Sequence, residues 1–176
     1  MALRNILREG EPTLRRRSRA VTDFNPRLHQ LIDDMRETLL NAGGAGLAAP
    51  QVGVLRAVAL VVDMEREAEN DSERIVELVN PEIVASSGEQ TGAEGCLSVP
   101  ELYGVVTRPD IVKVRAFDRN GALFEFTGKS MTARAICHEA DHLQGIMFTD
   151  LAERYLTKEE LDEMSRSEER DGSEGE

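Results

Sequence analysis

Two histidines four residues apart are the first feature of this sequence that could carry chemistry. The stretch AICHEADHLQG, residues 135–145, contains His138 and His142, two of the three histidines in the chain. Positions i and i+4 share one face of a helix, so both imidazoles can reach one metal ion. Glu139 lies about 100° around the same helix, outside the ligand positions but near a water bound there. The pattern therefore predicts a metal site with a carboxylate general base beside it.

A catalytic metal site normally has a third protein ligand and one position open to water. No histidine follows His142, and the remaining one, His29, lies far away in the chain. Cys137 points to a different side of the helix from the histidines, and we expect it to be a small buried hydrophobe. Cys96, in EGCLSVP, follows Gly95, which lets the backbone approach a ligand closely. From the residues alone, a thiolate ligand and an ordinary core cysteine both stay open for Cys96.

The glycine-rich segment GGAGLAAPQ, residues 43–51, is a third candidate site. Its small residues allow a peptide backbone to approach, and the side-chain amide of Gln51 offers an N–H donor. The segment lacks the Gly-Lys-Ser/Thr of a phosphate loop and the glycine pattern of a dinucleotide site. Taken alone, it is also consistent with an ordinary turn.

Three helices are expected to position these residues. One begins at Pro26 and has a one-sided apolar stripe that ends at the glycines 43 and 44. A second covers about residues 130–144, carries both histidines and ends at Gly145. The segment 157–160, TKEE, has the form of a capping box and opens a short third helix.

Short β-branched runs between the first two helices predict strands. They occupy residues 56–63, 74–84 and 110–118, and a turn at 119–121 leads into a further strand at 122–128. The strands do not alternate regularly with helices, which favours α+β over a doubly wound sheet. We expect mixed or antiparallel sheets packed around a central metal-binding helix, with an N-terminal helix and a short C-terminal helix.

Length and composition favour one domain without a membrane or nucleic-acid partner. The chain has 176 residues, 40% of them hydrophobic, and we expect a single catalytic domain over 1–164. No apolar run is long enough for a membrane span, no secretory signal opens the chain, and two cysteines do not suggest disulfides. These features predict a cytoplasmic protein. A net charge of −12 argues against broad phosphate binding.

The charge is uneven along the chain. Residues 1–19 carry six arginines against two glutamates, whereas residues 158–176 carry nine acidic against three basic residues. The last twelve residues, 165–176, contain no apolar side chain that could repay the entropy of ordering. We expect them to form an acidic, disordered tail.

The segments GAGLAAPQ, EGCLS and HEADHLQG, in this order, resemble the three signature motifs of bacterial-type peptide deformylases. The opening LREGEPTLRRRS and the central VTRPDIVKVRAFDRNG are also similar to that family, so the likeness covers most of the chain. The resemblance implies Cys96 as the third ligand, beside His138 and His142, of one divalent ion per chain. The family typically uses Fe(II) and also works with Ni(II) or Co(II), and Zn(II) suits the same ligands.

The resemblance also implies the reaction, which removes the N-formyl group from the initiator formyl-methionine of nascent chains and releases formate. Glu139 is expected to take a proton from the attacking water and deliver it to the departing amine nitrogen. The side-chain amide of Gln51 and the backbone N–H of Leu97 are expected to meet the developing oxyanion.

For the substrate, we expect an extended peptide that pairs with strand backbone left open at Gly46 and Gly95. The methionine side chain needs an apolar pocket. Met131 and Ala135 on the histidine-bearing face, with Ala45 and Leu97 opposite, are the candidates. A transient ribosome contact is a further expectation, and the basic cluster at residues 15–19 is its candidate surface. A solvated basic turn explains that cluster equally well.

Two other interpretations stay open from the residues. The first is a zinc endopeptidase in which a downstream glutamate, Glu153 or Glu160, is the third ligand. It predicts that loss of the glutamate, and not of Cys96, removes the metal. The second is a binding protein that kept the fold and lost the reaction, although Cys96 and Glu139 are both present.

Overall fold

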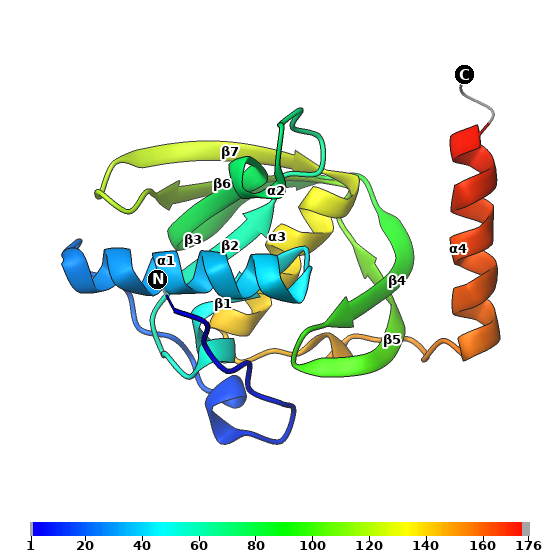
Figure 1. The fold of residues 1–176 in the computed structure, drawn as a ribbon, viewed down its shortest axis with the longest axis horizontal. Coiled ribbons are helices and arrows are strands. Elements are labelled where there is room, and N and C mark those ends of the chain that lie inside the picture. The colour runs from blue at the N-terminus through cyan, green and yellow to red at the C-terminus, as the bar shows by residue number, and fades with distance from the viewer. Residues whose placement is uncertain (1, 174–176) are drawn as a thin grey trace.

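The computed structural model describes residues 2–173, which form two antiparallel sheets and four α-helices (Figure 1). The larger sheet has the strand order β1-β2-β3-β6-β7, and β4 and β5 form a separate hairpin. The strands are β1 (Gly46–Ala48), β2 (Val58–Val62), β3 (Ile75–Ser87), β4 (Gln90–Cys96), β5 (Val99–Arg108), β6 (Ile111–Phe117) and β7 (Leu123–Lys129). The helices are α1 (Pro26–Ala42), α2 (Asp71–Arg74), α3 (Ser130–Leu143) and α4 (Lys158–Ser173). The predicted α+β class is confirmed.

Strand β2 is apolar throughout because both of its faces are covered. Val58 and Leu60 belong to one buried cluster, together with the α1 residues Ile32 and Met35. The alternate residue Val61 belongs to the cluster that contains β6 and α3 side chains. Successive strand residues point to opposite faces, so α1 and α3 pack on opposite sides of the larger sheet.

The central helix α3 lies between the larger sheet and the β4–β5 hairpin (Figure 1). Its residues Ala133, Ile136 and Cys137 pack against β6, which alternates buried Val112 and Val114 with exposed charges. Cys137 is thus the buried hydrophobe that the sequence predicts. Gly145, at φ 76°, follows the helix end in the left-handed conformation that favours glycine.

The β4–β5 hairpin encloses the other side of α3. Gly95 pairs with Tyr103, but the next pair is Cys96 with Val99. Residues 100–102 are therefore extra residues on β5, in a bulge. Glu101 within this bulge has a φ of 66°, which is uncommon for a residue other than glycine.

Asn80, in β3, fastens a loop to the sheet. Its side chain accepts a hydrogen bond from Val21 N at 2.7 Å and donates one to Val21 O at 2.8 Å. Its own backbone N–H donates to Ala57 O at 2.8 Å. Asn80 has a φ of 51°, a conformation that asparagine tolerates better than most residues.

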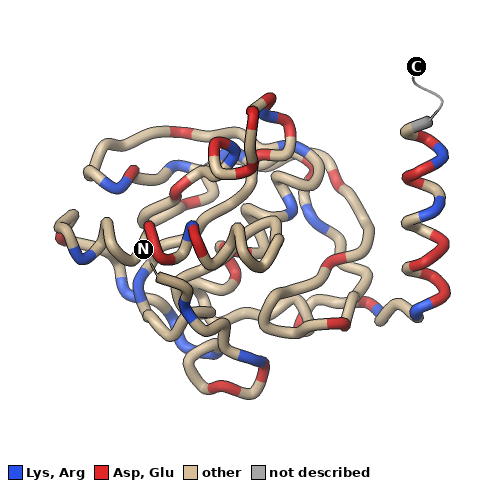
Figure 2. Tube along the Cα trace, in the orientation of Figure 1, with Lys and Arg blue, Asp and Glu red and all other residues tan. Residues whose placement is uncertain are grey.

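Helix α4 is longer than the sequence suggests. The capping box is present, since Thr157 N donates to Glu160 Oε2 and Glu160 N donates to Thr157 Oγ1. The helix continues to Ser173, so residues 165–173, for which we expect a disordered tail, are helical in the structure, while residues 174–176 lie outside the described part. Glutamate and arginine are good helix formers, and the segment contains no proline. Figure 2 shows mixed charges along α4, which stands apart beyond the β4–β5 hairpin.

Among the described residues, no helix combines the length and the apolar character that a membrane span requires.

Candidate metal centre and substrate cleft

Three donor atoms from two elements converge at the base of α3. The Nε2 atoms of His138 and His142 lie 3.1 Å apart, and Cys96 Sγ lies 3.3 Å from His142 Nε2. All three donors lie within 4.8 Å of one another. When ligand atoms each lie about 2.0–2.3 Å from one ion, the distances between them are similar to those seen here. One thiol and two imidazoles therefore form a ligand set that fits a divalent transition metal.

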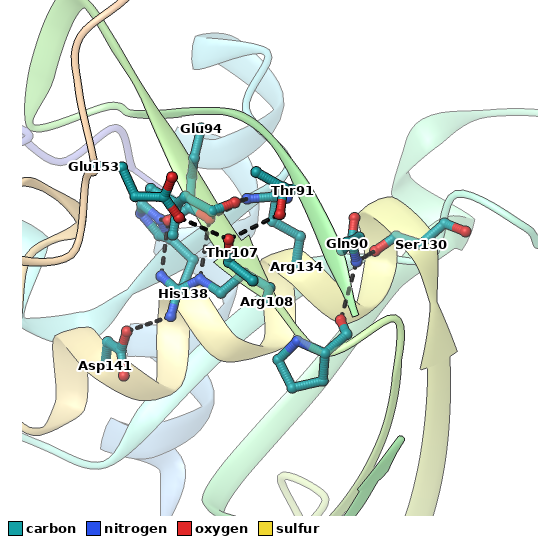
Figure 3. Close-up of polar contacts among 12 residues, drawn as sticks. Gln90, Thr91, Glu94, Thr107, Arg108, Ser130, Arg134, His138, Asp141 and Glu153 are labelled. Carbon is teal, nitrogen blue, oxygen red and sulfur yellow. Dashed lines mark hydrogen bonds and ion pairs between the residues drawn. The ribbon is translucent and has the colours of Figure 1, made fainter. Parts of the chain in front are cut away.

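Glu94 fixes the orientation of His138 (Figure 3). Its Oε2 lies 2.8 Å from His138 Nδ1, and its two oxygens accept hydrogen bonds from Arg108 at 2.8 and 3.1 Å. Arg134 Nη1 donates to Glu94 Oε1 at 3.0 Å, and Arg108 Nη1 donates to Asp141 Oδ2 at 2.7 Å. With its Nδ1–H directed at a carboxylate, His138 presents Nε2 to the donor cluster.

The charge state of Glu94 follows from these partners. Burial raises its pKa, but the hydrogen bonds with His138 and Arg108 outweigh burial and lower the pKa to about 2. Burial lowers the pKa of His142 well below its usual range, so that imidazole is neutral and free to bind a metal. For His138, partners Cys96 and Glu94 overcome burial and raise the pKa, so metal binding there would displace a proton.

Glu139 is a buried carboxylate beside this cluster. Its side chain is 3% exposed, and Oε2 has no hydrogen-bond partner among residues 2–173. Burial raises its pKa to about 7. A carboxyl group with such a pKa can take up and release a proton near neutral pH.

Gln51 lies on the other side of the cleft, where the chain turns after β1. Its Oε1 accepts from Ala48 N at 2.9 Å, which fixes the direction of the side chain. Its Nε2 donates to Ser98 Oγ at 3.2 Å and lies 3.6 Å from Cys96 Sγ. The turn ends at Gly53, whose φ of 81° explains the glycine there. The amide donor thus lies next to the thiol, where the sequence predicts an oxyanion donor.

A cavity of about 480 Å³ opens between β1, β4, β5 and α3. Gln51, Cys96, His138 and Glu139 line it. It is also lined by all of the residues predicted to contact the peptide or the methionine side chain, which are Ala45, Gly46, Gly95, Leu97, Met131 and Ala135. A Cβ atom at Gly46 would lie only 2.6 Å from Glu139 Oε1, and one at Gly95 only 2.5 Å from the Tyr103 ring. Only glycine leaves these two stretches of backbone uncovered.

The structure does not bring the downstream glutamates to the histidines. Glu153 accepts a hydrogen bond from Thr107, and Glu160 caps α4. Neither belongs to the donor cluster found among residues 2–173. His29 does not belong to this cluster either, and its Nε2 contacts the Arg119 carbonyl oxygen at 2.8 Å.

The charged residues behind His138 are not among the predicted site residues. Arg134 and Asp141 lie four residues before and three after it on α3, so a helical wheel could have placed them on the same face. Glu94 lies two residues before Cys96 and shares its side of a strand. Arg108 gave no signal, because it lies 14 residues after Glu94 and only the folded structure brings their side chains together.

The model of the polypeptide deformylase family matches residues 3–158. The chain belongs to this family. A deformylase from Caldanaerobacter subterraneus is 47% identical over 162 residues, covering 92% of this chain and 97% of the relative. The crystal structure of the Legionella pneumophila deformylase is 38% identical, with a TM-score of 0.79, and covers 96% of this chain and 99% of that one.

A further deformylase structure, from Acinetobacter baumannii, contains bound Met-Ala-Ser. It is 34% identical with a TM-score of 0.77 and covers 85% of this chain and 98% of that one. The predicted family is therefore confirmed, and with it a metal-dependent hydrolase that removes N-formyl groups from nascent peptides. The deformylase fold supplies a candidate site for the divalent metal that this family uses.

Proposed function

We propose that this deformylase hydrolyses the formyl amide of an N-terminal formyl-methionine in the cleft between β1, β4 and α3, releasing formate and a free amine. The observation that carries the proposal is the convergence of one thiol and two imidazoles within 4.8 Å, beside a buried carboxylate. Residues 1–164 are the proposed catalytic domain.

Cys96, His138 and His142 are the proposed ligands of one divalent ion. In the cell this ion is Fe(II) by family resemblance, whereas purified protein also accepts Ni(II), Co(II) or Zn(II). When bound, such an ion supplies Lewis-acid polarisation and a more acidic water. The Glu94 carboxylate holds His138 in the tautomer that a ligand needs.

Glu139 is the proposed general base and acid. It takes a proton as water attacks the formyl carbon and gives it to the amine nitrogen as the C–N bond breaks. Its unpaired Oε2 and its pKa of about 7 support this role, because the carboxylate is free to accept and the acid is able to donate.

Gln51 and the backbone N–H of Leu97 are the proposed donors to the oxyanion that develops on the formyl oxygen. The hydrogen bond from Ala48 N to Gln51 Oε1 supports the assignment, because it directs the amide N–H groups toward Cys96. A donor held in place before the reaction loses no free energy to reorientation during it.

The peptide is proposed to bind as an extended strand between Gly46 of β1 and Gly95 of β4. The methionine side chain then enters the apolar part of the cleft beside Ala45, Met131 and Ala135. The bound Met-Ala-Ser of the Acinetobacter deformylase supports a peptide of this kind as ligand.

The proposed setting is the cytoplasm, with formylated nascent chains as substrates and no specific nucleic acid or membrane partner. A brief ribosome contact through the basic cluster at residues 15–19 is part of this proposal. The charge of that cluster supports it, because ribosomal RNA phosphates attract arginine and repel the acidic α4.

The test is formate release from formyl-Met-Ala-Ser by protein purified without oxygen or chelator, with metal content measured on the same sample. We expect formate from the wild type, and loss of both formate and metal in Cys96→Ala. Cys137→Ala is the matched control, because that buried thiol packs against apolar side chains and should be dispensable. Bound metal without formate from Fe(II), Ni(II) or Co(II) protein would contradict the proposed substrate. Metal loss in Glu153→Gln instead would indicate the endopeptidase arrangement.

A further inference from the structure

The bulge in β5 places three residues at the mouth of the cleft. The pairing of Gly95 with Tyr103 and of Cys96 with Val99 leaves residues 100–102 without partners in β4. These three residues also line the cleft. A bulge re-aims the side chains that it contains, and here Glu101 adopts a left-handed φ of 66°. Backbone strain of this kind often lies at functional sites.

Glu101 differs from the other charged side chains that line the cleft. Glu94, Arg134, His138 and Glu139 are all buried. The Glu101 side chain is exposed, and within residues 2–173 it makes no hydrogen bond or ion pair. Its charge is therefore available to a ligand. The one lysine or arginine that lines the described cleft, Arg134, is buried and pairs with Glu94, not with Glu101.

The position of Glu101 fits the residues that follow methionine in a substrate. Val99 pairs with Cys96, and Glu101 lies two residues farther along β5, which places its Cα at most about 7 Å from that of Val99. An extended peptide whose formyl group is at Cys96 covers a similar span within two to three residues. Side chains at the second to fourth positions thus pass close to the carboxylate.

We propose that Glu101 is a specificity-determining residue that favours formylated peptides with lysine or arginine at positions two to four and disfavours aspartate or glutamate there. The inference rests on the proposed function, because it requires the peptide to lie in this cleft. Exposed charge pairs are weak, so the expected preference for lysine over glutamate is about two- to fivefold in kcat/KM. It should shrink as salt is added.

The experiment compares formyl-Met-Ala-Xaa-Ala peptides with lysine, glutamine or glutamate at Xaa, and repeats the comparison with the variable residue at positions two and four. In the wild type, kcat/KM should fall in the order lysine, glutamine, glutamate at one or more positions. Glu101→Gln should equalise the three while leaving the glutamine peptide within about twofold of the wild type. Glu101→Lys should reverse the order.

Glu82→Gln is the matched control. Glu82 is also exposed and unpaired in the described chain, but it lies by a separate cavity on the other side of α3. The Glu82→Gln substitution removes the same net charge as Glu101→Gln, and the variant should keep the wild-type preference for lysine. Equal kcat/KM values for the three peptides in the wild type, or a lysine preference that remains in Glu101→Gln, would overturn the inference. In both cases formate from the glutamine peptide would still show that deformylation occurs. Absence of formate from the neutral peptide would overturn the proposed function as well.

Discussion

Glu139 combines two properties that a proton carrier needs. It is buried beside the donor cluster, which raises its pKa, and one oxygen has no partner among the described residues. An exposed glutamate at the same helical position would be ionised at neutral pH and would be a poor acid for the leaving amine. The fold thus raises the pKa of Glu139 by removing its carboxyl group from water, so that this one group can be both base and acid.

Glu139→Gln should therefore retain the metal and lose most of the activity. The amide cannot carry the proton, and general acid–base catalysis typically contributes 10²–10⁴-fold, so kcat should fall by about that factor. Formate release and metal content measured on one sample check this prediction. Activity close to that of the wild type would remove Glu139 from proton transfer.

Gln51→Leu should lower kcat by about 100-fold or more, because the variant keeps the bulk of the side chain and loses the donor beside Cys96. Metal content and KM should change little, since the substitution removes an interaction that strengthens in the transition state. Steady-state kinetics on formyl-Met-Ala-Ser separate the two parameters. If kcat changes only a few-fold, Gln51 is a structural partner of Ala48 and Ser98 and not an oxyanion donor.

At the scale of the element, the cleft depends on two strands whose backbones are left uncovered by glycine. The two positions differ in what a side chain would meet. A Cβ at Gly46 would contact the Glu139 carboxylate and the Leu60 carbonyl oxygen, 2.6 and 2.9 Å away. A Cβ at Gly95 would meet the ring of Tyr103, which is 42% exposed and has room to turn away.

Gly46→Ala should therefore cost more than Gly95→Ala. For Gly46→Ala we expect a loss of about 1–3 kcal/mol in the free energy of unfolding, because backbone and a buried carboxylate must move, together with at least tenfold lower kcat/KM. Gly95→Ala should unfold close to the wild type and act mainly through KM. Urea unfolding and formate kinetics on both variants test the order, and the reverse order would mean that β1 is the more adaptable strand.

The elements were predictable to different degrees. The sequence correctly predicts α1, α3 and the β6–β7 hairpin, because each has an apolar period and an end signal such as Gly145. The β4–β5 hairpin has no such period, since its residues Glu94 and Arg108 are charged and buried against each other. The donor set was predicted from motifs. The ionic network behind it was not predicted, because it depends on side-chain contacts that join α3 to β4 and β5.

At the scale of the whole molecule, one carboxylate makes several of the contacts that hold the N-terminal segment to α1. Asp34 accepts from Ala2 N and Gln30 Nε2 and pairs with Arg4 at 2.9 Å, while its side chain is 7% exposed. Burial raises the pKa of Asp34, but the hydrogen bonds from Gln30, Ala2 and Arg4 outweigh it and lower the pKa below 3.8.

Asp34→Asn should destabilise the protein at neutral pH by about 1–3 kcal/mol, because buried donors lose a charged acceptor. Since the pKa is lower in the folded state, the wild-type advantage is present above about pH 4 and is lost as the pH falls through the folded pKa. Urea unfolding at pH 7 and pH 3 tests the sign. Asp71→Asn, at a side chain 74% exposed, is the control and should be nearly neutral. A penalty that stays constant with pH would show that packing, not charge, is what Asp34 supplies.

The side chain of Asn80 has a consequence for the loop that leads into α1. Its side-chain amide accepts from the N–H and donates to the C=O of Val21, so it satisfies the two backbone groups that a neighbouring strand would otherwise pair. Val21 is 7% exposed and belongs to the cluster that includes α1 and β2 side chains. Its amide hydrogen should therefore exchange with deuterated solvent only when β3 itself opens, so one side-chain amide gives a loop residue the protection of a strand residue.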